Sequence, residues 1–185
     1  MTRAILLVVA ALATPGAPPP AENEPMTPVL ALDLQRYAGT WYEIARLPNP
    51  FQAKCARSVV VRYGLRDDGR LDVVNECAEA DGRIRRASGV ARRADPQGPP
   101  SKLKVRFAPA ILSFLPSVWG DYWVIDLAPD YSYAVVGEPK RQYLWILSRS
   151  PRMPEPLYAE ILGRAARHYD VSRVVRTVHV EPPGP

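Results

Sequence analysis

The chain has 185 residues, of which 47% are hydrophobic, and this fits one domain with a sizeable core better than two. Its net charge of +5 is mild, it has no Lys/Arg run longer than two, and no nucleic-acid-binding motif is present. These features argue against nucleic acid as a partner. We interpret the basic excess as a solvated surface, with attraction to an anionic membrane surface or anionic ligand as the alternative.

The N-terminus has the pattern of a secretory signal. Arg3 precedes a short apolar run, residues 4–13, which is too short to span a bilayer. We predict a signal peptide over 1–13, with cleavage as late as residue 21 as an alternative. The protein is then exported and soluble, in the periplasm of a bacterial cell. No Cys lies at the cleavage point, so we do not expect an outer-membrane lipid anchor.

Residues 14–30 are rich in Pro, Ala and Glu, which predicts an extended tether. The folded domain is predicted over 31–181, with a Pro-rich tail over 182–185.

From residue 40 the pattern is one of strands separated by turn residues, such as Asp67-Asp68-Gly69 and Asp81-Gly82. Short sequential connections favour an all-β, eight-stranded, antiparallel up-and-down β-barrel. An apolar stripe over 154–169 predicts one C-terminal α-helix packed outside the barrel, followed by a short strand over 174–180. The eight predicted strands are 40–46, 57–66, 70–78, 83–93, 101–107, 121–128, 132–138 and 142–149.

Cys55 and Cys77 are the only cysteines. In an exported chain they predict one disulfide, because the second and third strands form a hairpin that brings the two residues together. Two buried free thiols are the alternative.

Alternation within the strands separates inward from outward faces. Tyr63, Phe107, Tyr122 and Trp145 point inward from four strands, and Asn75 shares a face with apolar neighbours. These aromatics either fill the barrel interior or line a cavity with apolar walls and a few polar anchors. We interpret them as ligand-binding residues.

Arg149 shares the face of Trp145, so its guanidinium points under the barrel, where it needs an aromatic face or hydrogen-bond acceptors. Trp41, which follows Gly39 at the start of the first strand, is the predicted aromatic partner. We interpret Gly39, Trp41 and Arg149 as a structural plug at the closed end. Glu43 shares the face of Trp41 and either has another partner or lies beside Arg149.

Gly39-Thr40-Trp41, Asp130-Tyr131 and Arg149, in this order and with the strands between them, resemble the signature of the lipocalins. The resemblance is strongest to the bacterial lipocalins, the plant temperature-induced lipocalins and apolipoprotein D. It implies a barrel that holds a hydrophobic molecule such as a fatty acid, lysophospholipid, sterol or tetrapyrrole. It also places Tyr63, Asn75, Phe107, Tyr122 and Trp145 at pocket positions.

The connection 108–120 is unusually apolar for a loop. In a meander barrel it lies at the same end as the loop 47–56, which is the open mouth. Leu112, Phe114, Leu115 and Trp119 therefore either form a lid over the cavity or contact a membrane or partner.

We predict binding and carriage or storage of a small hydrophobic ligand of the fatty acid or lysophospholipid class, with a role in cell-envelope lipid maintenance. The alternatives are a lipocalin-type enzyme acting on a lipid-like substrate and a ligand-free partner-binding module. We expect no catalytic residue, metal site or cofactor, because His168 and His179 lie outside the predicted cavity and a thiol nucleophile would require a free Cys77.

Overall fold

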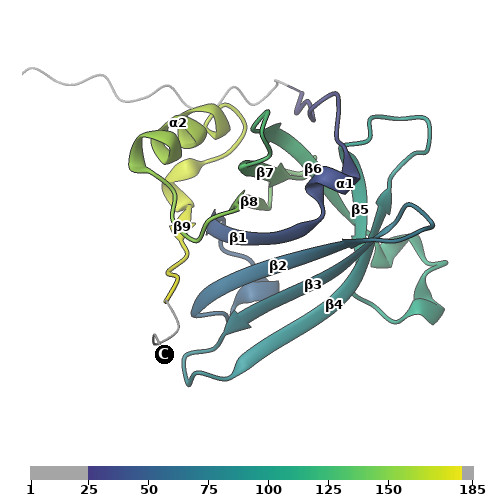
Figure 1. The fold of residues 1–185 in the computed structure, drawn as a ribbon, viewed down its shortest axis with the longest axis horizontal. Coiled ribbons are helices and arrows are strands. Elements are labelled where there is room, and N and C mark those ends of the chain that lie inside the picture. The colour runs from purple at the N-terminus through teal and green to yellow at the C-terminus, as the bar shows by residue number, and fades with distance from the viewer. Residues whose placement is uncertain (1–24, 181–185) are drawn as a thin grey trace, which may run out of the picture.

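The computed structural model of the protein describes residues 25–180 (Figure 1). The predicted signal peptide, most of the predicted tether and the tail 182–185 lie outside these residues. Eight strands follow one another as an antiparallel meander, and β1 pairs with both β8 and β2, which closes the barrel. The predicted fold is confirmed. The barrel strands are β1 (Gly39–Arg46), β2 (Arg57–Leu65), β3 (Leu71–Ala78), β4 (Ile84–Arg93), β5 (Lys102–Arg106), β6 (Gly120–Leu127), β7 (Tyr133–Gly137) and β8 (Leu144–Ser148).

The tight hairpins form where the turn residues indicate them. Gly69 joins β2 to β3 with φ of +76°, and Gly82 joins β3 to β4 with φ of +88°. Glycine adopts this left-handed conformation without the steric penalty of a Cβ. The two turns thus set the register of the β2–β3–β4 hairpins.

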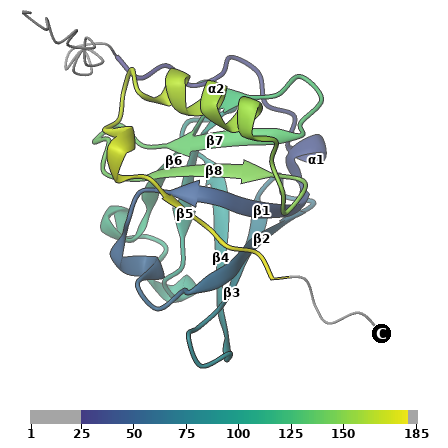
Figure 2. The same cartoon turned by 90° about the vertical axis from the view of Figure 1, so that its left-hand side faces the viewer.

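The helix α2 (Glu155–Ala165) is shorter than the predicted 154–169 but covers the outer wall of the barrel, as predicted (Figure 2). Tyr158, Ile161 and Ala165 pack in one buried cluster with Ile44 and Ile146 of the neighbouring strands. This second apolar core lies outside the barrel, because β1, β7 and β8 present apolar side chains on both faces.

Residues 25–30 differ from the predicted tether because they pack on the barrel. Met26 is buried in the cluster beneath α2, and Val29 packs against the barrel interior. The Val29 N–H donates to Val124 O at 2.9 Å, and Ser101 Oγ donates to Val29 O. Proline content alone indicated an extended chain, but the apolar side chains between the prolines anchor this part of it.

The C-terminal segment crosses the gap where β1 and β2 diverge. β9 (Val175–Arg176) pairs with β1, and the Thr177 N–H donates to Ile44 O at 2.9 Å. On the other side, the Ser58 N–H donates to Val178 O at 2.8 Å. The predicted strand over 174–180 is therefore present, although regular pairing covers only two residues.

The two ends of the barrel differ. The connections β2–β3, β4–β5 and β6–β7 share one end with α1 (Leu34–Tyr37), which closes it. The opposite end carries the long connections with the 3-10 turns η1 (Pro50–Gln52), η2 (Ala110–Leu112) and η3 (Pro116–Val118). We call this end the mouth. Away from it, a fourth 3-10 turn, η4 (Val171–Arg173), follows α2. The predicted disulfide Cys55–Cys77 is confirmed and ties the β1–β2 loop to β3 at the mouth.

Candidate ligand-binding site

Arg149 closes the barrel at the α1 end. Its guanidinium carbon lies 3.8 Å from the centroid of the Trp41 ring. Nη2 donates to the carbonyl oxygens of residues 36–38 at 2.6–3.2 Å, and Nη1 donates to Thr40 O at 2.9 Å. The last carbonyls of a helix have no partners within it, so the guanidinium satisfies the end of α1 while the ring covers its charge.

Gly39 makes this arrangement fit. It adopts φ of +97° between α1 and β1, in the region that favours glycine. A Cβ at this position would lie 3.3 Å from Arg149 Nη1. The Trp41 Nε1–H donates to Tyr37 O at 2.8 Å, which locks the indole under the helix. Gly39, Trp41 and Arg149 therefore lie together at the closed end.

Three tyrosines form a layer beside this plug, with the Tyr37 ring centroid 5.1 Å from that of Trp41. The Tyr122 hydroxyl lies 2.7 Å from the hydroxyl of Tyr37 and 2.7 Å from that of Tyr63. Burial raises the pKa of all three hydroxyls, and the positive charge of Arg149 partly opposes this pKa rise at Tyr37 and Tyr63. The layer is therefore neutral at pH 7. Each of the three hydroxyls therefore has a hydrogen-bond partner within the layer.

Toward the closed end the inner side chains are buried. Trp41, Leu71, Leu103, Val124 and Val136 are all at most 1% exposed. Side chains fill this half of the barrel, as expected for an eight-stranded barrel without a ligand at that depth. Tyr63 and Tyr122, predicted as pocket residues, instead contact Tyr37 of the closing helix α1.

Toward the mouth, several inward-facing side chains are open to solvent, although Val61 is buried there. Ala87 lies directly opposite Asn75 on β3 and is exposed, and Asn75 is half-buried. Phe107 is 44% exposed, and its ring lies next to Gly89 on the same inner face. Trp145 is half-buried. The predicted pocket residues Asn75, Phe107 and Trp145 thus surround the mouth half.

Glu43 is 2% exposed and has partners other than Arg149. Its carboxylate accepts from Arg46 Nη1 at 2.7 Å and from Gln52 Nε2 at 2.5 Å. The Gln52 side-chain oxygen in turn accepts from Trp145 Nε1 at 2.8 Å. A loop residue, Gln52, thereby ties the β1–β2 loop to a predicted pocket residue. Strand alternation gives no signal for it, because it belongs to a 3-10 turn.

The connection between β5 and β6 places its apolar side chains in solvent. Ile111 is 80% exposed and Phe114 is 74% exposed, while Leu112 is half-buried and Leu115 is exposed. Trp119, predicted as part of the same surface, instead packs with the guanidinium groups of β4 and β5.

His168, His179 and Cys77 are the residues considered for the enzymatic alternative. His179 contacts the outside of β1, with Nε2 2.7 Å from Glu43 O, and His168 follows α2. Cys77 is bonded to Cys55, so the thiol required by the enzymatic alternative is absent from the folded protein. Within residues 25–180, no group of three or more His, Cys, Asp or Glu side chains has metal-binding geometry.

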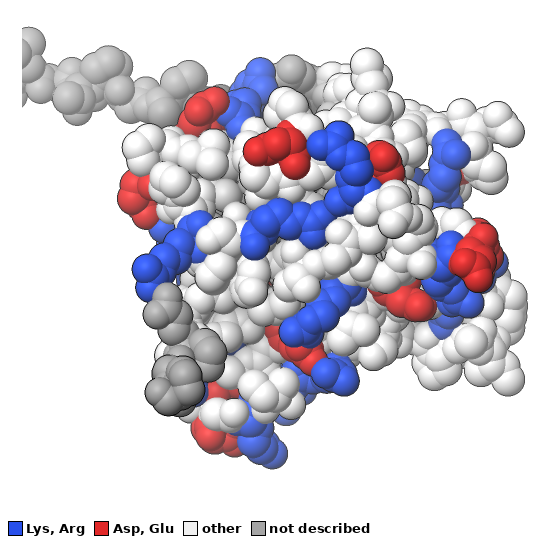
Figure 3. Space-filling view, viewed as in Figure 1, with Lys and Arg blue, Asp and Glu red and all other residues white. Residues whose placement is uncertain are grey.

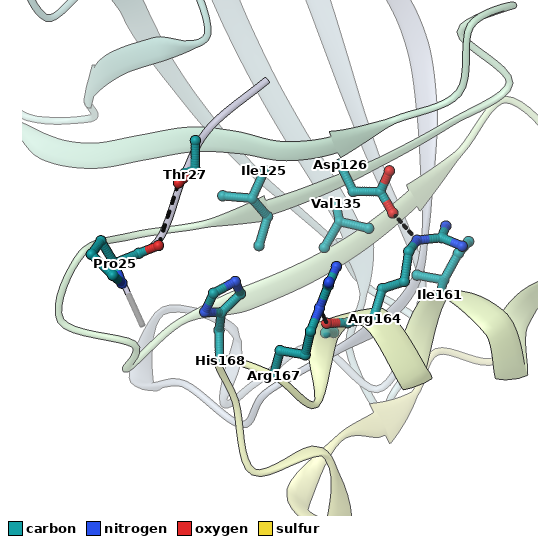
Figure 4. Close-up of a pocket in the computed structure, with 10 residues that line it drawn as sticks. Pro25, Thr27, Ile125, Asp126, Val135, Ile161, Arg164, Arg167 and His168 are labelled. Atoms are coloured by element: carbon teal, nitrogen blue, oxygen red, sulfur yellow. Dashed lines mark hydrogen bonds and ion pairs between the residues drawn. The ribbon is translucent and has the colours of Figure 1, made fainter. Parts of the chain in front are cut away.

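Two hollows lie outside the barrel. One, of about 230 Å³, separates α2 from β6 and β7 and is bordered by Arg164, Arg167 and His168 (Figure 4). Its Arg164 side chain is engaged by Asp126 at 2.8 Å and by Glu160 at 2.6 Å. The other, of about 290 Å³, lies near Met153 below β8. Neither contains a predicted pocket residue.

Acidic and basic side chains are interspersed on the face shown in Figure 3. This distribution fits the interpretation of the net charge as a solvated surface. Within the described residues no helix has the length and apolarity needed to cross a membrane.

A closed meander barrel with one external helix and a Gly-x-Trp–Arg plug defines the lipocalin class. Residues 32–179 match the family model of a lipocalin-like domain, and the chain belongs to the lipocalin family. It is 40% identical to temperature-induced lipocalin-1 of Arabidopsis thaliana over 88% of this chain and 87% of the relative. It is 37% identical to the outer membrane lipoprotein Blc of Escherichia coli over 84% of each chain.

Apolipoprotein D of Rattus norvegicus is 32% identical over 75% of this chain and 67% of the relative. Among solved structures, insecticyanin from the tobacco hornworm Manduca sexta superimposes with a TM-score of 0.65 at 20% identity, over 88% of both chains. The resemblance to bacterial lipocalins, plant temperature-induced lipocalins and apolipoprotein D is confirmed. Members of this family bind small hydrophobic ligands.

We expect Arg149→Lys to lower the free energy of unfolding by about 2–3 kcal/mol, because lysine keeps the charge but loses the planar fork that reaches several carbonyls. Urea denaturation followed by circular dichroism measures this. Arg70→Lys in the exposed β2–β3 hairpin is the matched control and should change stability by less than about 0.5 kcal/mol. Equal effects of the two substitutions would contradict the assigned role of Arg149.

The tyrosine layer predicts an alkaline loss of stability. The unfolded chain releases tyrosine protons near pH 10, whereas the folded layer keeps them, so its contribution is complete below pH 10 and is lost as pH rises. Tyr122→Phe should reduce the slope of unfolding free energy above pH 10 by about 1.4 kcal/mol per pH unit. Urea denaturation at pH 8, 10 and 11 gives the slopes, and equal slopes for both proteins would rule out a buried Tyr122 hydroxyl.

Proposed function

We propose that this protein binds and carries or stores a small hydrophobic ligand of the fatty acid or lysophospholipid class in the mouth half of its barrel. One observation carries the proposal. Ala87 and Phe107 point inward yet are exposed, whereas the inward side chains of Trp41 and Leu103 toward the closed end are buried. An apolar chain that enters from the mouth would cover these surfaces.

The energetics support an acyl chain. Eight to ten buried methylene groups contribute roughly 6–8 kcal/mol, which corresponds to a dissociation constant near micromolar. Affinity of this size needs no charged anchor. The half-buried Asn75 amide is a polar group available to orient a ligand oxygen.

We favour carriage over catalysis because the described residues provide apolar inner side chains and the tyrosine layer, and we find no nucleophile–base pair among them. Cys77 is in a disulfide, and His179 faces the outside of β1. A ligand-free partner-binding module would not need exposed aromatic side chains inside the barrel. Export to the periplasm and a role in cell-envelope lipid maintenance complete the proposal, supported by the N-terminal apolar run.

Ala87→Trp should lower affinity for oleate or lysophosphatidylcholine at least tenfold. The new indole would occupy the space above the tyrosine layer and displace several methylene groups, each contributing about 0.8 kcal/mol. The measurement is displacement of the fluorescent probe N-phenyl-1-naphthylamine by the lipid.

Ser88→Trp is the matched control, since the adjacent residue faces outward on the same strand. It should bind lipid like the wild type. If neither lipid displaces the probe from the wild-type protein, or if both tryptophan variants bind equally well, the barrel is not the ligand site.

We further propose that the mouth makes transient contact with a lipid membrane, from which the ligand enters. Ile111 and Phe114 are exposed at this end, as is Phe51 of the β1–β2 loop at 65%. The mouth also carries Lys54 in the same loop. Exposed apolar side chains combined with basic residues are typical of interfacial membrane binding.

The double variant Ile111→Ser, Phe114→Ser should reduce flotation with phospholipid vesicles at least tenfold, because each substitution removes a large apolar side chain from the contact. Leu30→Ser is the matched control; Leu30 is 86% exposed but lies beside the closed end. Flotation of the double variant at the level of the wild type would exclude this loop as the membrane contact.

A further inference from the structure

Trp119 holds two arginines against one aromatic ring. The guanidinium carbon of Arg92 lies 4.4 Å from the ring centroid and that of Arg106 lies 5.3 Å from it. Arg92 belongs to β4 and Arg106 to β5, and both side chains are on the outer face of the barrel. The two charges are therefore closer than a Debye length, which is about 10 Å at 0.1 M salt.

No carboxylate among the described residues forms an ion pair with either arginine, whereas the neighbouring Lys104 is paired with Asp121 at 2.9 Å. Arg106 is only 8% exposed. Its Nη1 donates to Ala108 O, and its buried Nε lacks a hydrogen-bond partner. A buried charge is costly unless it is paired, so this position favours an anion from outside the chain.

The same tryptophan connects the arginines to the apolar loop. The Trp119 Nε1–H donates to Ser113 O at 2.8 Å. Ser113 lies between Ile111 and Phe114, which are the most exposed apolar side chains of the loop. This hydrogen bond links the cationic pair to the apolar tip, with Trp119 between the basic and apolar parts.

We propose that Arg92 and Arg106, held by Trp119, bind the phosphate group of an anionic phospholipid at the membrane surface while Ile111 and Phe114 enter the acyl layer. This inference rests on the proposed membrane contact at the mouth and specifies its headgroup chemistry. Arg92, which is exposed, makes the direct contact. Arg106 adds the second charge from its covered position.

Phosphate is the chemistry that this arrangement recognises best. A guanidinium presents its N–H groups as a planar fork that matches two phosphate oxygens, and it is less strongly hydrated than an ammonium group. The indole of a tryptophan favours the level of the headgroups. A purely structural role for the stack would require only one cation on the ring and would not leave the second without a counter-ion.

The test compares flotation of the full chain with vesicles of pure phosphatidylcholine and with vesicles containing 30% phosphatidylglycerol. A basic residue near an anionic surface contributes about 1 kcal/mol, so Arg92→Gln should weaken binding to the anionic vesicles about fivefold. Arg70→Gln, which removes the same charge at the closed end, should leave binding within twofold of the wild type. Arg106→Lys keeps the charge but not the fork and should weaken binding as well.

Equal losses for Arg92→Gln and Arg70→Gln would show that only the overall charge matters, and this would overturn the proposal. So would equal binding of the wild type to both vesicle types. If Arg106→Lys fails to fold, Arg92→Gln alone decides, because its side chain is exposed. Inorganic phosphate at constant ionic strength should compete with the anionic vesicles, and no competition would exclude phosphate as the recognised group.

A measurement of oleate binding inside the barrel tests the carrier function separately from the proposed headgroup site. Oleate should displace the fluorescent probe from the Arg92→Gln variant as it does from the wild type, since Arg92 faces outward. A wild type that binds oleate but does not prefer anionic vesicles would retain the carrier function and lose the headgroup site. A wild type that prefers anionic vesicles but does not bind oleate would show the reverse.

Discussion

The rest of the structure depends on the guanidinium of Arg149 between the indole of Trp41 and the carbonyls at the end of α1. A cation at the bottom of an apolar barrel is costly unless every polar group around it is satisfied. Here the carbonyls of residues 36–38 and of Thr40 accept its protons, and the ring covers one face. The contact joins the helix, the first strand and the end of the last barrel strand, and so determines which end of the barrel is closed.

The tyrosine layer connects this plug to the strands of the barrel interior. Tyr37 from α1 reaches Tyr122, which also contacts Tyr63, so the plug and the strands share one hydrogen-bonded floor. Below it, packed side chains provide stability. At the mouth, the Cys55–Cys77 disulfide and the Glu43–Gln52–Trp145 chain of hydrogen bonds fix the β1–β2 loop to the barrel strands. The most buried inner side chains therefore lie toward the closed end, and the exposed ones lie toward the mouth.

Strand alternation predicted most of this arrangement, including the shared face that brings Arg149 to Trp41. It could not reveal partners outside regular strands. Tyr37 lies on a four-residue helix and Gln52 on a 3-10 turn, so neither has a face that periodicity predicts. The pairing of Glu43 with Arg46 depends on a register shift in β1, which brings the two side chains together. Trp119 looked like part of the apolar loop, but cation–π contacts draw it to the outside of the barrel.

The central claim is that a hydrophobic ligand occupies only the mouth half of the barrel, above the tyrosine layer. The four tryptophans report on this directly, since each indole N–H gives one signal in a nitrogen–proton correlation NMR spectrum. On addition of oleate we predict that the Trp145 signal shifts and that the Trp41 signal stays in place. A shift of Trp41, or no shift of Trp145, would contradict the proposed position of the ligand.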